Sequence, residues 1–303
     1  MLNQTTIKKE VKISGIGLHT GVNSTAIFKP APENFGIRFK RSDLKNSPEI
    51  IADIDHVIDI SRGTTISQNN CKIHTVEHIL SAIYGLEINN LLIELTEKEP
   101  PIMDGSARPF VDILLSAGIK TQDAIQNELI IDQTITYSEP DRGVDIHILP
   151  SDKFRITFMT DYNVYPLGTQ YTAMYSLKNN FIDDFAPART FCLFSEILQL
   201  NKLGLIKGGN LDNAIVFVDN EIDKKSVIQL KKIFNTNQSF SKGKHGILND
   251  KKLRFYNEPV RHKVVDLIGD MALIGIPIRG HIIAARSGHA ANVKLVKKIK
   301  NIY

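Results

Sequence analysis

Alternating apolar and polar positions fill the first 60 residues of this 303-residue chain and predict antiparallel strands. The alternation covers residues 6–14, 23–28 and 35–39, and turn-forming residues separate these stretches. The sequence GIGLHTG at 15–21 carries three glycines and predicts a flexible turn. His19 lies at its tip and could contact a ligand, but we expect it to stabilise the loop through hydrogen bonds.

Helical patterns follow in the rest of the first half. A helix of about ten residues is predicted to start at Thr75, with Thr75 or His74 as its cap and Gly85 as its end. A strand at 90–95 comes next, and a second helix is predicted over 109–117 because proline favours the first helical turn.

The same order of elements begins again near residue 129. We expect strands at 129–137, 144–149, 154–159 and 280–285, and helices at 189–200 and 259–273. A second α+β unit of similar plan is the simplest interpretation, although no residue-level repeat is visible. The polar stretch 120–127 predicts a boundary between domains 1–127 and 128–303. Residues 191–218 are interpreted as an insertion in the second domain.

Composition narrows the class of protein. With 42% hydrophobic and 23% charged residues, the chain is typical of a soluble globular protein. A net charge of +4, with lysine clusters that lack interleaved aromatic residues, argues against nucleic-acid binding. The two cysteines form no Cys-x-x-Cys pattern, and the first ten residues hold no apolar segment. We therefore expect a cytoplasmic protein without disulfides, signal peptide or membrane span.

The predicted helix at 259–273 carries a polar stripe. His262, Asp266 and Asp270 recur every four residues and so share one helix face, which apolar residues surround. Buried acids need partners, and a metal ion would be a good one. The alternative is a half-exposed helix whose polar stripe faces water.

A second concentration of chemistry lies in HTVEH at 74–78. This matches the H-x-x-E-H pattern of inverted zinc peptidases, in which two histidines bind zinc and the glutamate is the general base. A hydrolytic zinc site takes three protein ligands, and His78, His262 and Asp266 would also supply that set. Glu77 could then act as general base, and His289, paired with Asp270, could stay protonated as an acid.

The chain resembles the zinc-dependent UDP-3-O-acyl-N-acetylglucosamine deacetylases of lipid A biosynthesis over nearly all of its residues. Seven motifs in the family's order carry the resemblance, and they are GIGLHTG (15–21), TVEHILS (75–81), PIMDGSA (101–107), ARTF (188–191), GGNLDNAIV (208–216), VRHKVVDLIGD (260–270) and SGHA (287–290). The resemblance implies two α+β sandwich domains, each with its own insert, with the zinc site between them.

The resemblance also implies roles for individual residues. His78, His262 and Asp266 correspond to the zinc ligands and Glu77 to the general base. His289 corresponds to the general acid that also stabilises the oxyanion. Asp270 corresponds to the partner of His289, Thr190 to the hydroxyl at the tetrahedral intermediate, and Lys263 to a substrate-binding lysine. His74 is not a ligand in the family, which makes it a helix cap or a residue behind the ligands.

Substrate contacts follow in the same way. The insertion at 191–218 corresponds to the passage for the acyl chain, which Phe191, Ile197 and Gly209 are expected to line. Leu18 is also expected to bind the substrate. Tyr162 and Arg286 are expected to meet uracil and diphosphate, although the segment DYNVYP at 161–166 departs from the family's pattern. The implied reaction is hydrolysis of the 2-acetamido group, which yields acetate and a free amine. A zinc metallopeptidase and a non-catalytic binding module are the alternatives.

Overall fold

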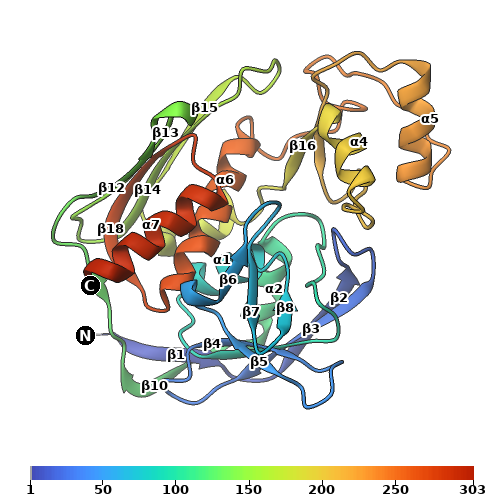
Figure 1. Cartoon of the computed structure of the whole chain (residues 1–303). Helices are drawn as coiled ribbons and strands as arrows, with labels where there is room; N and C mark the ends of the chain where they lie inside the picture. The colour runs from blue at the N-terminus through green and yellow to red at the C-terminus, as the bar shows by residue number, and fades with distance from the viewer. Residues whose placement is uncertain (1) are drawn as a thin grey trace.

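Two sheets of the same topology form the framework of the molecule, which a computed structural model describes for residues 2–303 (Figure 1). The first has the spatial order β2 (Val11–Ile16), β3 (Asn23–Pro30), β9 (Leu91–Leu95), β4 (Ile37–Arg41) and β5 (Glu49–Ile51). The second has the order β12 (Ile135–Glu139), β13 (Val144–Leu149), β18 (Ile278–Ala285), β14 (Phe154–Asp161) and β15 (Thr169–Met174).

In both sheets the strand that comes last along the chain occupies the centre. Counted along the chain, it runs antiparallel to the second strand of its sheet and parallel to the third. The outer pairs are antiparallel. The two halves therefore share strand order and strand direction. The predicted α+β class and the predicted repetition of plan are both confirmed.

The helices repeat as well. Each central strand has one helix before it and one after it, namely α1 (Glu77–Gly85) and α2 (Arg108–Ala117) around β9, and α6 (Glu258–Met271) and α7 (His289–Ile302) around β18. In Figure 1 these helices lie between the two sheets. A single hydrophobic core joins both halves, with Phe28 and Ile79 from the first and Phe158 and Val264 from the second.

The equivalent helices α1 and α6 pack directly on each other. Gly269 permits this close approach, since a Cβ atom there would lie 2.2 Å from the carbonyl oxygen of Glu77. Because α1 carries Glu77 and His78 while α6 carries His262 and Asp266, this packing brings the two motif-bearing segments together.

Smaller elements complete the two halves. β1 (Asn3–Ile7) pairs with β10 (Ile119–Ile125), and β6 (Val57–Asp59), β7 (Thr65–Gln68) and β8 (Cys71–Ile73) form a three-stranded sheet. β11 (Leu129–Ile130) pairs in parallel with the start of β18. The short helices are η1 (Ile54–His56), η2 (Pro140–Arg142), α3 (Leu177–Asn180), η3 (Phe181–Phe185) and η4 (Ala272–Ile274). The domain division after residue 127 stays a prediction.

A lobe with its own hydrophobic core projects from the second half (Figure 1). It contains β16 (Phe191–Leu193), α4 (Phe194–Lys202), β17 (Ile215–Phe217) and α5 (Lys224–Ile233). Its core includes Ile197, Leu230 and Leu248, so the lobe continues well past residue 218, where the predicted insertion ended. Among residues 2–303, no helix is both long enough and apolar enough to cross a membrane.

Several predicted boundaries are wrong. The stretch 6–14 is divided between β1 and β2, and 129–137 is divided between β11 and β12. The helix predicted from residue 189 begins only at Phe194, because Phe191 instead pairs with Ile215 in a parallel ladder.

The predicted cap of α1 is wrong as well. Val76 occupies the N-cap position and makes no capping hydrogen bond through its side chain. The Thr75 hydroxyl donates to Glu99 instead, and the His74 ring contacts the Thr65 hydroxyl.

Candidate active site

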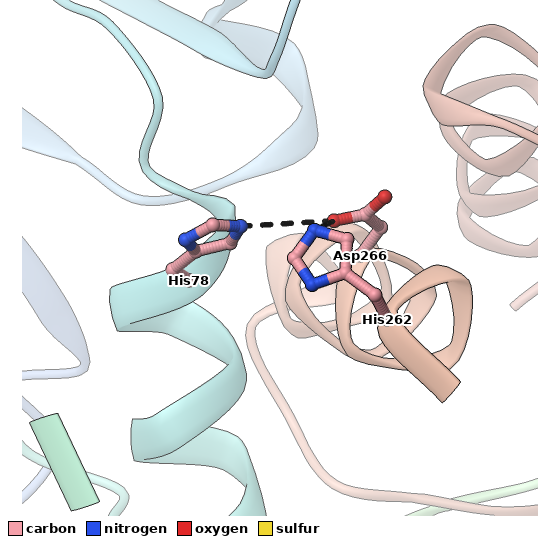
Figure 2. A group of neighbouring side chains, drawn as sticks. All are labelled: His78, His262 and Asp266. Carbon is pink, nitrogen blue, oxygen red and sulfur yellow. Dashed lines mark ion pairs between the residues drawn. The ribbon is translucent and has the colours of Figure 1, made fainter. Parts of the chain in front are cut away.

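Three buried side chains meet where the first turn of α1 faces α6. His78 comes from α1, and His262 and Asp266 lie one turn apart on α6 (Figure 2). Each offers one ligand atom, and these atoms all lie within 4.8 Å of one another. The two halves of the molecule therefore share a candidate metal centre.

Hydrogen bonding and charge fit this group to a cation. The His262 Nδ1 atom donates to the Ala188 carbonyl at 3.0 Å, which leaves Nε2 unprotonated and 3.3 Å from Asp266 Oδ1. Burial and the neighbouring His262 lower the pKa of His78 to about 3. Burial would raise the pKa of Asp266, but Lys263 and the histidines hold it below its ordinary value. Two neutral imidazoles and a carboxylate are ligands that divalent metals bind.

Glu77 precedes the His78 ligand and is itself buried. Its Oε2 atom accepts a hydrogen bond from the Thr64 backbone at 2.9 Å, and the Cα of Gly63 lies close to Oε1, since a Cβ there would be 2.7 Å away. Burial raises the pKa of this carboxyl from 4.5 to about 7. A carboxylate with a pKa near neutrality is suited to accept and return protons.

His289 begins α7 and lies beside the same group. Its Nδ1 atom donates to Asp270 Oδ2 at 2.8 Å, and its Nε2 atom is 3.9 Å from Asp266 Oδ2. Burial would lower the pKa of His289, but Asp270, Asp266 and Glu77 raise it to about 10. In the metal-free protein these carboxylates favour the protonated imidazole at neutral pH. Glu77 and His289 thus differ in pKa in the direction that separates a base from an acid.

Aromatic and cationic side chains border the metal ligands. The Phe191 ring centroid lies 6.5 Å from His262 and 5.9 Å from both Tyr162 and Phe217. The Lys263 ammonium bonds Asp266 Oδ2 at 2.8 Å and lies 5.8 Å from the Phe191 centroid. The lysine therefore belongs to the same cluster as the ligands.

Comparison with known sequences bears on this cluster. A sequence profile of the family described as "LpxC: UDP-3-O-acyl N-acetylglycosamine deacetylase" matches residues 4–235 and 234–301. The chain belongs to this family. The match spans both halves and therefore includes every residue of the candidate centre.

Individual relatives have names that agree with this family membership. The chain is 48% identical over 301 residues to a "Bifunctional enzyme LpxC/FabZ" of Chlorobaculum tepidum, which covers 99% of this chain and 64% of that protein. It is 37% identical to the UDP-3-O-acyl-N-acetylglucosamine deacetylase of Chlamydia caviae, with 99% and 97% covered, and to that of Anaeromyxobacter dehalogenans, with 98% and 87% covered. The chain thus spans less than two thirds of the bifunctional relative and nearly all of the Chlamydia deacetylase.

The segment around Thr190 is held rigidly beside the centre of this deacetylase-family chain. The Thr190 backbone pairs with Gly105 and Ile215, and Arg189 forms a buried ion pair with Glu258 at 2.8 Å. Ala188, which orients His262, lies in the same segment. Anchoring this segment therefore positions a metal ligand as well as Thr190.

Of the expected substrate contacts, Phe191 belongs to the cluster beside the ligands, whereas Leu18, Gly209 and Ile197 make other contacts. Leu18 approaches Gly209, where a Cβ would be 3.7 Å from the leucine Cδ1 atom, and the Gly208 backbone donates to the Leu18 carbonyl at 3.0 Å. Ile197 is buried in the core of the lobe. Arg286 is exposed and pairs with Asp161, next to Tyr162.

The remaining histidines of the motifs have structural contacts. His74 lies outside the three-residue group, and its Nδ1 atom is 3.1 Å from the Thr65 hydroxyl. The His19 ring donates to the Arg62 carbonyl, and its backbone amide donates to Glu99. Sequence reasoning missed Thr64 and Asn292, which hydrogen-bond Asp270, because neither forms part of a recognisable metal-binding or catalytic pattern.

Proposed function

We propose that the protein is a zinc-dependent deacetylase that hydrolyses the 2-acetamido group of a UDP-linked, 3-O-acylated N-acetylglucosamine to acetate and a free amine. One observation carries the proposal: a buried three-ligand group, His78, His262 and Asp266, adjoins the buried carboxyl of Glu77 and the imidazole of His289, which Asp270 holds through Nδ1. Family membership supports the choice of substrate.

Each catalytic step is assigned to a residue. Zinc at His78, His262 and Asp266 would polarise the amide carbonyl and lower the pKa of its bound water from 15.7 to about 7. Glu77 accepts the proton of the attacking water. Protonated His289 donates a hydrogen bond to the developing oxyanion together with Thr190, and Glu77 or His289 protonates the leaving nitrogen. Asp270 keeps the His289 ring protonated and oriented.

Substrate binding extends from this centre in two directions. Lys263 is assigned to the sugar or diphosphate beside the metal, with Tyr162 and Arg286 toward the nucleotide. Leu18, Phe191, Ile197 and Gly209 are assigned to the acyl chain, which would enter the lobe. We place the reaction in the bacterial cytoplasm as a step of lipid A biosynthesis, supported by the bacterial origin of the named deacetylases.

Replacement of the proposed base tests the chemistry. Glu77→Ala should reduce deacetylation about 10²- to 10⁴-fold, which is the usual contribution of a general base. Glu87→Ala, an exposed glutamate just beyond the other end of α1, is the matched control and should retain activity. Activity of Glu77→Ala within a few-fold of the unmodified protein would remove Glu77 from the mechanism.

Metal content separates the proposal from its rivals. Asp266→Ala should lose stoichiometric zinc, whereas His74→Ala should keep it, because His74 lies outside the ligand group. Loss of zinc from His74→Ala but not from Asp266→Ala would instead favour the peptidase arrangement. A purified protein without stoichiometric metal, unaffected by a chelator, would favour a binding module.

A further inference from the structure

Thr64 lies between two carboxylates of the proposed mechanism, those of the base Glu77 and of Asp270, the partner of His289, and contacts both. It directly precedes β7 and is fully buried, with 0% of its surface exposed. Its backbone amide donates to Glu77 Oε2 at 2.9 Å, and its hydroxyl donates to Asp270 Oδ1 at 2.6 Å. Glu77 belongs to α1 of the first half and Asp270 to α6 of the second, so a single residue links the carboxylates across the junction of the halves.

The hydrogen-bond inventory assigns every proton around Asp270. A carboxylate only accepts, so the single Thr64 hydroxyl proton points to Oδ1. Oδ2 accepts from His289 Nδ1 and from Asn292 Nδ2, both at 2.8 Å. The Thr64 oxygen, 3.3 Å from His289 Nδ1, can then receive only a share of the proton on Nδ1. The other ring nitrogen, Nε2, faces the metal ligands and is left to exchange protons.

The residue before Thr64 completes the contact with Glu77. Gly63 has a φ of +141°, and a Cβ at this position would lie 2.7 Å from Glu77 Oε1. The dipeptide thus lies against one carboxylate oxygen and donates to the other. Glu77 is held by backbone atoms, which have less freedom than a side chain, while Asp270 is held by the Thr64 hydroxyl.

We propose that Thr64 is a positioning residue that holds the general base Glu77 and the acid pair Asp270–His289 in a fixed relative geometry. The inference rests on the proposed deacetylation. Thr64 bonds neither the three ligands nor any residue assigned to the substrate, so its loss affects the turnover step and leaves metal and substrate binding in place. Outer partners of catalytic groups typically contribute about 10- to 100-fold.

The test removes the hydroxyl of Thr64, which bonds Asp270, and separately that of Thr65, which contacts His74. Thr64→Val keeps the backbone amide and the branched shape but removes the hydroxyl, and kcat should fall about 10- to 100-fold with KM changed less than about two-fold. Thr64→Ser keeps the hydroxyl and should restore kcat to within about three-fold of the unmodified protein. The matched control is Thr65→Val, a neighbouring buried threonine whose hydroxyl meets only the ring of His74, and it should retain kcat.

A second readout follows the hydrogen bond itself. The His289 Nδ1 proton should give a downfield NMR signal that is absent from His289→Gln, shifted in Thr64→Val and unshifted in Thr65→Val. If Thr64→Val folds poorly, Thr64→Ala and Thr64→Ser replace it, since both lose the methyl group and differ in the hydroxyl.

Three results would overturn the role of Thr64: full kcat in Thr64→Val, equal losses in Thr64→Ser and Thr64→Val, or an equal loss in Thr65→Val. Each can occur while Glu77→Ala is inactive, so failure of this inference is distinct from failure of the proposed function.

Discussion

Gly269 offers a direct test of how the junction of the halves supports the centre. A Cβ atom at this position would lie 2.2 Å from the Glu77 carbonyl oxygen and 2.9 Å from its Cα, whereas ordinary contacts begin near 3.4 Å. Gly269→Ala would therefore force α1 and α6 apart by about 1 Å, because the obstructing atoms are backbone and cannot rotate away.

Two contributions to the unfolding free energy of Gly269→Ala oppose each other, namely helix propensity and overpacking. Alanine favours the helix over glycine by about 1 kcal/mol, so the substitution would stabilise the chain if it met no obstacle. Overpacking in a core costs about 1–3 kcal/mol and more where backbone must move, so we expect a net loss of unfolding free energy. A displacement of about 1 Å at Glu77 and His78 should also lower kcat/KM on the order of 10²-fold.

Urea unfolding, bound zinc and deacetylation would be measured on the same preparation. We expect a lower unfolding midpoint, weaker zinc retention and reduced kcat/KM together, since one displacement produces all three. A Gly269→Ala protein that is as stable as the unmodified chain and retains its zinc would show that the helices tolerate separation. The link between packing and site geometry would then be wrong.

Three further predictions concern charge. Asp270→Asn removes the carboxylate that contributes most to raising the pKa of His289 to about 10. The alkaline limb of the kcat/KM profile should therefore move to lower pH, and an unmoved limb would contradict this pairing. In metal-free protein, burial raises the pKa of Glu77 from 4.5 to about 7, so the folded state holds a proton that the unfolded state releases in this window. The unfolding free energy of Glu77→Gln should therefore exceed that of the unmodified chain increasingly from pH 5 to 7, and a difference independent of pH would count against it. Arg189→Met leaves the Glu258 charge buried and unpaired, so it should lower the unfolding free energy in urea by about 3–5 kcal/mol. Arg108→Met breaks an exposed ion pair and should cost less than about 1 kcal/mol. Similar losses in the two variants would refute the distinction between buried and exposed pairs.

Local pattern predicted the α+β class and most elements of the two halves. The strand at 144–149 matches β13, and the predicted helix at 109–117 differs from α2 by one residue. One predicted boundary was wrong because a segment pairs with residues distant in the sequence. A helix was predicted from residue 189. Phe191 instead pairs with Ile215 in a parallel ladder, and its ring packs among Tyr162, His262 and Phe217.

The candidate site divides in the same way. The spacing of His262, Asp266 and Asp270 places them on one helix face, and this periodicity is visible in the sequence. The resemblance assigned His78 to the same centre, and the packing of α1 on α6 brings it there. The sequence pattern could not distinguish Asp266, which faces the two histidines, from Asp270, which bonds Thr64, His289 and Asn292.

What the sequence determined by itself is the identity of the chemical groups and the elements that carry them, because residue type and a helical or strand period act over a few neighbouring positions. Only the tertiary structure decided which groups meet. Thr64 and Asp270 are 206 residues apart, and their contact depends on two sheets of equal topology packing around α1 and α6 at the close distance that Gly269 allows. The protonation states follow from the same packing, since burial and neighbouring charge, rather than residue type, separate the pKa values of Glu77 and His289.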